Sequence, residues 1–178
     1  MRTHFDEAQV KSAVGRLADL VGAAFRADEP LNIIGVRSRG DVLADRLIRL
    51  LRERGYSKIG RGVLDITLYR DDLSGAGARP VVQRTDINVD IDDKPLLLVD
   101  DVLYTGRSVR SALNALIDLG RPSVIRLAVL VDRGGRELPI QADFVAMTLS
   151  DVPLDRRVTV RFTEEDGKDE IVVEPHVG

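Results

Sequence analysis

Cysteine is absent from the 178 residues, and the only two histidines, His4 and His176, lie near the ends of the chain. Without cysteine there are no disulfides, thiolate zinc sites, iron–sulfur ligands or cysteine nucleophiles. Without a histidine between the ends, we expect neither a Ser-His-Asp triad nor a histidine general base. Catalysis would then use carboxylates, hydroxyls, arginines, backbone amides or a hard metal ion, a set that favours phosphate chemistry.

Long apolar runs are missing as well. No run approaches the ~18 residues of a membrane-spanning helix, and the polar start MRTHFDEAQV lacks the apolar core of a secretory signal. We therefore expect a cytoplasmic protein with no membrane partner. The content of 44 % hydrophobic and 31 % charged residues is typical of a globular chain, and the length predicts a single domain over residues 1–178.

Lysine is scarce: 22 of the 26 basic residues are arginine, and the net charge is −3. This balance does not indicate a nucleic-acid-binding chain. Arginine's planar fork suits bidentate recognition of phosphate. A high arginine content also follows from the base composition of a genome, and we favour that simpler explanation of the count.

Segments with helical spacing alternate with apolar or β-rich runs, which predicts an α/β fold with a mostly parallel central sheet flanked by helices. The helices are expected at 6–26, 41–54 and 108–119, and the strands at 31–36, 63–69, 95–99, 124–131 and 143–147. A hairpin is expected around Asp166-Gly167. The polar region 70–90 predicts a long loop or mobile hairpin of the kind that covers binding sites.

Chemistry concentrates in residues 96–110, LLLVDDVLYTGRSVR. A buried strand ends there in Asp100 and Asp101, and a loop with Thr105-Gly106 then opens a helix. Ligands bind at the carboxyl ends of parallel strands, and phosphates bind at helix N-termini. Paired carboxylates suit a diol or a magnesium ion. Phosphate, diol and metal together describe a ribose 5-phosphate.

Other interpretations of these residues fit less well. GVRSRG at 35–40 has the glycine spacing of a Walker A loop, but Asp41-Val42 follow where that loop needs Lys and Ser or Thr. The dinucleotide fingerprint G-x-G-x-x-G does not occur. LLLVDD could open a receiver domain, yet only 77 residues follow Asp101, too few for that fold. An acidic strand end on a solvated loop is the simplest alternative, and the Thr-Gly and helix start argue against it.

VDDVLYTGRSVR resembles the phosphoribosyl-diphosphate (PRPP) motif of type I phosphoribosyltransferases. Together with four further segments it is similar to the PyrR family, pyrimidine operon attenuators that are also uracil phosphoribosyltransferases. Those segments are GVRSRG at 35–40, LDITLYRDDL at 64–73, DLGRPSVIRLAVLVDRGGRELPI at 118–140 and ADFV at 142–145. The resemblance covers most of residues 5–145. It implies a type I phosphoribosyltransferase fold with a small hood, about 131–140 plus the C-terminal hairpin, and a flexible active-site loop at about 70–90.

The resemblance also implies the reaction of uracil with PRPP to give UMP and diphosphate, with Mg²⁺ held mainly through PRPP and no dedicated protein cage. By similarity, Asp100 and Asp101 would bind the ribose hydroxyls and Arg39 would neutralise the leaving diphosphate, with Arg70 and Asp72 at the loop hinge. The implied PRPP-binding residues are Arg37, Ser38, Arg39, Asp100, Asp101, Val102, Leu103, Tyr104, Thr105, Gly106, Arg107 and Ser108. The implied base-binding residues are Val131, Asp132, Arg133 and Gly134. Arg37 and Arg39 as plain exposed loop charges remain the alternative.

The family's second activity is binding of pyrimidine-operon mRNA through a basic surface, and here the chain departs from the pattern. Asp19 stands where members often carry His, and 146–148 read Ala-Met-Thr instead of Gly-Lys-Asn. Arg16 and Arg136 remain as candidate RNA contacts, so weak or lost RNA binding is expected.

The alternative function is a pyrimidine-responsive mRNA-binding attenuator with little enzyme activity. A type I relative that uses hypoxanthine or guanine is a third possibility, against which LYRDDL and DRGxRELPI argue. The family resemblance favours a homodimer or a higher even oligomer, with UMP and UTP as further ligands.

Overall fold

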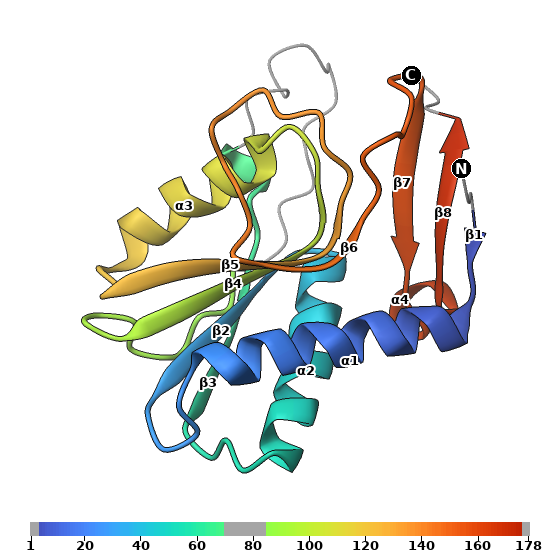
Figure 1. Cartoon of the computed structure of the whole chain (residues 1–178). Coiled ribbons are helices and arrows are strands. Elements are labelled where there is room, and N and C mark those ends of the chain that lie inside the picture. Colours follow the sequence, from blue (N-terminus) through green and yellow to red (C-terminus); the bar gives the residue numbers. More distant parts are fainter. Residues whose placement is uncertain (1–3, 70–84, 176–178) are drawn as a thin grey trace.

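Five parallel strands form the centre of the computed structural model, which describes residues 4–69 and 85–175 (Figure 1). In spatial order they are β3 (Ile59–Leu64), β2 (Leu31–Val36), β4 (Pro95–Leu103), β5 (Val124–Asp132) and β6 (Phe144–Thr148). Every neighbouring pair is parallel, so the carboxyl ends of the strands meet at one edge of the sheet. The predicted α/β fold class is confirmed.

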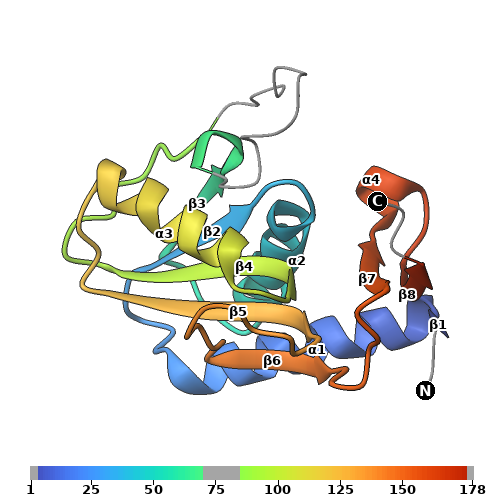
Figure 2. The same ribbon diagram turned by 90° about the horizontal axis from the view of Figure 1, so that it is seen from above.

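Helices cover both faces of this sheet (Figures 1 and 2). They are α1 (Glu7–Ala24), α2 (Arg39–Glu53) and α3 (Arg107–Leu119). Ile33 and Leu97 belong to the core that contains α1 and α2, whereas Ile34 and Leu98 belong to the core that contains α3. Successive side chains of a strand point to opposite faces, and burial on both sides explains the continuous apolar runs that predicted these strands. In the described ranges, no helix is both long and apolar enough to cross a membrane.

A second, antiparallel sheet of three strands stands beside α1 and α2 (Figure 1). Its order is β1 (His4–Phe5), β8 (Glu170–Pro175) and β7 (Arg156–Arg161). β7 and β8 form the predicted C-terminal hairpin, and the short helix α4 (Thr163–Asp166) makes its connection. Phe162 and Val160 are fully buried in the same core as α1 and α2, so this sheet packs against the layer that carries α2.

The strand predicted at 63–69 is wrong in position, since the strand in this region is β3 at Ile59–Leu64. β3 pairs with β2 from Leu31–Ile59 to Val36–Leu64, and both strands end at the same edge. Beyond Leu64, the Asp65 carboxylate accepts hydrogen bonds from the N–H and the hydroxyl of Thr67 at 2.9 and 2.5 Å. These hydrogen bonds favour a turn over an extended strand at this point. A short 3-10 helix, η1 (Thr67–Tyr69), follows in place of the predicted strand.

The predicted loop at 70–90 lies mostly outside the described residues, as do Arg70 and Asp72. Its described end returns antiparallel to β3, because Val63 and Asp86 exchange two backbone hydrogen bonds of 2.8 Å. The Thr85 hydroxyl accepts a further hydrogen bond from the backbone N–H of Asp65 at 3.1 Å. The chain therefore comes back to the carboxyl edge of the sheet close to where it left.

Candidate active site at the carboxyl edge of the sheet

Two adjacent carboxylates lie within β4, which runs on through Leu103 rather than ending at Val99 as predicted. Asp100 is buried, with 7 % of its surface exposed. Its Oδ1 accepts from the backbone N–H of Asp101, and Oδ1 of Asp101 accepts from the N–H of Val102, both at 2.9 Å. The backbone of the central strand therefore holds both carboxylates at the edge where ligands bind.

Burial makes both carboxyl groups weaker acids than an exposed aspartate. It raises the pKa of Asp100 well above the ordinary value, and the neighbouring Asp101 charge adds to the rise. Burial also raises the pKa of Asp101, although the Arg39 guanidinium opposes this rise. A buried carboxylate is stabilised by hydroxyl donors and by cations. The pair is thus suited to a ligand that brings a diol and an associated metal ion.

The phosphate loop, residues 104–108, connects β4 to α3. Gly106 precedes the first residue of α3 with φ +92°, a left-handed conformation that favours glycine. A Cβ at this position would lie 3.3 to 3.4 Å from the side chains of Leu138 and Ile140. The opening N–H groups of a helix have no partner within it and carry a positive partial charge. This turn therefore presents an anion-binding helix start beside the carboxylates.

A second loop, between β2 and α2, faces the same carboxylates. It contains Arg37 and Ser38, joined by a cis peptide bond, and α2 begins at Arg39. A hydrogen bond to Asp166 is the main cause that raises the pKa of the Arg39 guanidinium, and the charge of Asp101 adds to the rise. Two loops that each run from a strand into a helix thus place cationic and N–H groups on two sides of the acidic pair.

A cavity of about 200 Å³ lies between these loops. Its lining residues are Val36, Arg37, Ser38, Arg39, Ile66, Thr67, Asp100, Asp101, Val102 and Ser108. Seven of these ten are residues that the sequence predicted for PRPP binding. Sequence reasoning missed Val36, Ile66 and Thr67, although Ile66 and Thr67 lie two and three residues beyond a strand whose end meets the same edge.

The other predicted PRPP-binding and base-binding residues that the structure describes belong to the connection from β4 into α3 and to the end of β5. Leu103, Tyr104, Thr105, Gly106 and Arg107 form the connection into α3. Val131 and Asp132 end β5, the strand next to β4. Val131 is fully buried in the core, and the Asp132 carboxylate accepts from the N–H of Gly134 at 2.9 Å. The Val131 side chain is in the core and the Asp132 carboxylate is engaged locally, so a base would be contacted through the backbone of residues 131–134.

Arginine side chains hold the hood segment, residues 131–140, against the phosphate loop. The Arg136 guanidinium donates to the backbone oxygens of Tyr104 and Ile140, both at 2.8 Å, and to the Asp132 carboxylate at 2.5 Å. The buried Arg133 stacks 3.7 Å from the centre of the Tyr104 ring. A Cβ on Gly135 would lie 2.5 Å from that ring, so only glycine fits this close contact.

The two candidate RNA contacts occupy different environments. Arg16 is exposed on α1, where it donates to the hydroxyl of Ser12 at 3.3 Å and to the backbone oxygen of Ala146 at 3.4 Å. Arg136 uses its guanidinium within the hood. The structure therefore gives Arg136 an internal bracing role that the sequence did not predict.

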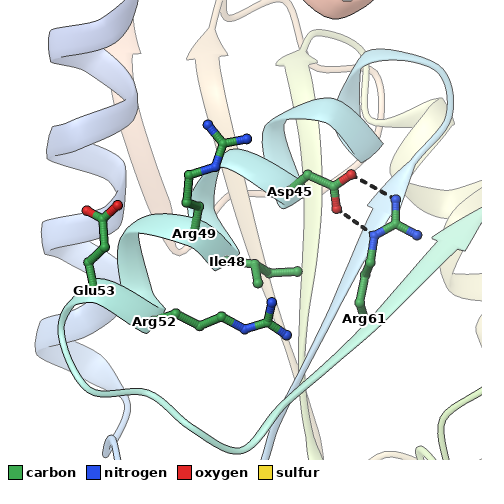
Figure 3. Close-up of a pocket in the computed structure, with 6 residues that line it drawn as sticks. All are labelled: Asp45, Ile48, Arg49, Arg52, Glu53 and Arg61. Carbon is green, nitrogen blue, oxygen red and sulfur yellow. Dashed lines mark hydrogen bonds and ion pairs between the residues drawn. The ribbon is translucent and has the colours of Figure 1, made fainter.

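A larger hollow, of about 600 Å³, lies beside α2 and β3 (Figure 3). It is lined by Asp45, Ile48, Arg49, Arg52, Glu53 and Arg61. Arg61 already forms a bidentate ion pair with Asp45, at 2.5 and 2.8 Å. Its six lining residues include no hydroxyl, strand end or helix start. The smaller cavity at the carboxyl edge is the candidate active site.

Residues 6–161 match the model of the phosphoribosyl transferase domain family. Proteins named Bifunctional protein PyrR share 48 % identity over 174 residues in Chloroflexus aurantiacus and 50 % over 161 in Deinococcus radiodurans. The first alignment covers 94 % of this chain and 95 % of that protein, the second 90 % and 87 %. The chain belongs to the PyrR family. This PyrR-family chain is a phosphoribosyltransferase, as the resemblance predicted.

Solved structures agree with this PyrR assignment at the level of fold. A hypoxanthine-guanine phosphoribosyltransferase from Bacillus anthracis superposes with a TM-score of 0.69 at 18 % identity, covering 97 % of this chain and 98 % of the other. The Leishmania tarentolae enzyme in complex with GMP gives 0.70 at 18 %, covering 99 % and 97 %. At this identity the likeness shows a shared fold and does not decide the base.

Proposed function

We propose that this PyrR-family chain transfers the 5-phosphoribosyl group of PRPP to uracil, producing UMP and diphosphate. The observation that carries the proposal is one cavity bordered by the buried Asp100 and its neighbour Asp101, the start of α3 and the Arg39 guanidinium. These groups match the diol, the 5-phosphate and the diphosphate of PRPP in turn. The PyrR relatives, which share about half of the residues, support uracil as the base.

In the proposed reaction, the bond between C1 of the ribose and the diphosphate oxygen breaks, and diphosphate leaves with the electron pair. A bond from N1 of uracil to C1 forms, and the N1 proton passes to solvent water. Positive charge develops on the ribose ring between these events. Positioning and charge stabilisation are sufficient for such a step, and no covalent nucleophile is needed.

The protein groups would divide this work between them. Asp100 and Asp101 would hold the ribose hydroxyls and lie close to the developing positive charge. The Arg39 guanidinium would stabilise the negative charge that grows on the leaving diphosphate. The phosphate loop at the start of α3 would anchor the 5-phosphate. Asp100, Asp101, Arg39 and Ser108 all line the cavity, which supports this division of roles.

Magnesium fits this site because Asp100 and Asp101 line the cavity and carboxylate oxygens are the ligands that Mg²⁺ prefers. We propose that Mg²⁺ is held mainly by PRPP. In the described part of the chain, no group of three or more His, Cys, Asp or Glu side chains could hold a metal ion. When bound, Mg²⁺ would neutralise charge on the diphosphate.

We also propose weak RNA binding as a secondary activity. Of the two candidate contacts, only Arg16 presents its guanidinium on the surface. Asp19, on the same helix, forms an ion pair at 2.6 Å with Arg54, the residue that follows α2, so a matched pair of charges rather than an excess of positive charge lies at this part of α1. Fewer neutralised phosphates mean lower affinity for RNA. The alternative function, an mRNA-binding transcription attenuator with little enzyme activity, is therefore less favoured than the transferase.

The test is UMP formation from uracil, PRPP and Mg²⁺ with the purified chain, and with Asp101→Asn as control. The substitution removes a carboxylate charge at almost unchanged volume, so a turnover loss of about tenfold or more is expected with unchanged folding. Hypoxanthine and guanine are assayed in parallel. Turnover with a purine but not with uracil would replace the proposed base, and unchanged kcat/KM in the variant would overturn the assignment of Asp101.

A further inference from the structure

One ion pair connects the C-terminal turn, residues 162–169, to the candidate active site. Nη2 of Arg39 donates to Oδ1 of Asp166 at 2.7 Å, and Nε donates to Oδ2 at 3.1 Å. Asp166 lies 127 residues farther along the chain. Its carboxylate is only 15 % exposed, and Arg39 lowers its pKa. This pair is therefore a well-formed bidentate contact with little solvent screening.

The contact leaves part of the guanidinium available. Asp166 occupies the edge formed by Nε and one N–H of Nη2. Nη1 and the second N–H of Nη2 have no partner among the residues that the structure describes. Arg39 lines the cavity that also holds Asp101. Because a guanidinium is planar, fixing one edge sets the direction of the other.

Docking of the C-terminal turn does not depend on Asp166. Arg46 lies seven residues after Arg39 on α2, two turns along the same face of the helix. It pairs with Asp169 at 2.5 Å and with Glu164 at 2.6 Å, and it stacks 4.6 Å from the centre of the Phe162 ring. This second set of contacts is larger than the first, and its Arg46–Asp169 pair is more buried than the Arg39–Asp166 pair. It attaches the turn to α2 without help from the Arg39–Asp166 pair.

We propose that Asp166 is a positioning residue for the diphosphate half of the substrate site. It holds the Arg39 guanidinium so that its remaining N–H groups meet the diphosphate of PRPP. This inference rests on the proposed function, since it assigns Arg39 to that diphosphate. It makes the C-terminal hairpin a part of the substrate site and not only a structural addition.

Asp166 has two opposing effects on the affinity of the site for the diphosphate of PRPP. Its negative charge weakens the attraction of the site for diphosphate, while its hydrogen bonds pre-orient the arginine. Pre-organisation lowers the entropic cost of forming the bond to the ligand. The lost orientation should be the larger effect of removing Asp166, because no other residue in the described ranges holds the Arg39 guanidinium by a hydrogen bond. We therefore expect weaker PRPP binding when Asp166 is removed.

The experiment compares Asp166→Ala with the matched control Asp169→Ala in the same turn. Asp166→Ala should raise the KM for PRPP and the inhibition constant of diphosphate about tenfold, the effect of losing one oriented charge-assisted contact. The KM for uracil should stay within about twofold. Asp166→Asn, which retains an oxygen acceptor for Arg39, should restore part of the loss.

The control separates positioning from stability. Asp169 accepts four hydrogen bonds, two from Arg46 and two from Thr163, whereas Asp166 accepts three. A structural role alone would make Asp169→Ala the more damaging change for both melting temperature and PRPP binding. An unchanged or lowered PRPP KM in Asp166→Ala, or equal shifts in both variants, would overturn the proposal.

Calorimetric titration with PRPP and Mg²⁺ provides a readout that does not need turnover. Should the wild type bind PRPP but form no UMP, the proposed reaction fails while the role of Asp166 is still measured. In that case a tenfold weaker PRPP Kd in Asp166→Ala, with Asp169→Ala unchanged, is the expected result. Equal Kd values in all three proteins would overturn the positioning role.

Discussion

Arg136 donates a 2.8 Å hydrogen bond to the backbone oxygen of Tyr104, and this contact ties the hood segment to the phosphate loop. The same guanidinium binds the backbone oxygen of Ile140 and the carboxylate of Asp132. A single side chain thus braces the two segments proposed to hold the 5-phosphate and the base. The structure gives this arginine a role in site geometry, since two of these contacts are within the hood segment and one is to the phosphate loop.

Replacement of Arg136 by alanine should therefore destabilise the chain. Three partly buried acceptors would lose a charged donor, and a cost of about 2 to 3 kcal/mol in unfolding free energy is expected. The measurement is urea denaturation. Arg52→Ala is the control, because Arg52 is exposed on α2 and forms no ion pair within the described ranges. Equal unfolding free energies for the two variants would rule out the bracing role.

The part of the fold that could be predicted is the part whose side chains are buried on both faces. The strands at 31–36, 95–99 and 124–131 appear as apolar runs because helices cover both sides of the sheet. The strand expected at 63–69 failed, since the Asp65 turn depends on one side-chain hydrogen-bond pattern rather than on β propensity.

The site could be predicted where its residues are contiguous, and not where it depends on distant contacts. The run from Asp100 to Ser108 carries strand end, carboxylates and helix start within a few residues. Asp166 meets Arg39 across 127 residues, and no local pattern indicates that contact. For Arg136, sequence alone does not distinguish a surface guanidinium from one folded back onto backbone oxygens.

Arg39→Ala should impair the diphosphate side of the reaction. Loss of the guanidinium removes the cation beside the leaving group, and kcat/KM for PRPP should fall by about a hundredfold, as for removal of one transition-state donor. The inhibition constant of diphosphate should rise in the same variant, while folding stays intact. Equal diphosphate inhibition in the variant and the wild type would count against the assignment of Arg39.

Gly106→Ala should weaken binding of the 5-phosphate. The residue adopts φ +92°, and an added Cβ would press on Leu138 and Ile140. Backbone strain of this kind costs about 1 kcal/mol or more, and relaxation would move the phosphate loop. The expected result is a several-fold higher KM for PRPP in steady-state kinetics. Gly55→Ala is the control, since Gly55 has the same φ but no neighbour near its Cβ. A PRPP KM raised equally in both variants would contradict the argument.

Acid should loosen the attachment of the C-terminal turn. Hydrogen bonding to Arg46 lowers the pKa of Asp169 from 3.8 to about 2. A lowered folded-state pKa adds stability above the unfolded value, and this stability is lost as the pH falls from about 4 towards 2. The contribution is roughly 2 kcal/mol for this mostly buried group. Asp169→Asn should reduce stability at neutral pH and flatten the loss between pH 4 and 2.

Denaturant unfolding at several pH values measures this loss, and Asp155→Asn is the matched control. Asp155 is exposed, with no ion pair in the described part of the chain. Its replacement should leave the stability at neutral pH unchanged. The same acid-dependent loss in Asp169→Asn as in the wild type would show that the Arg46 contact does not link pH to stability.

RNA binding should be weak and should depend on Arg16 more than on Arg136. Each neutralised phosphate contributes about one unit to the slope of log K against log salt. Replacing the exposed Arg16 by alanine should therefore reduce that slope by about one. The measurement is a salt-dependent titration with a pyrimidine-operon leader RNA, again with Arg52→Ala as control. Arg136→Gln should lower RNA affinity only to the extent that it lowers stability, because its guanidinium is folded onto the hood. Abolished RNA binding in Arg136→Gln with unchanged unfolding free energy would instead place that arginine on the RNA surface.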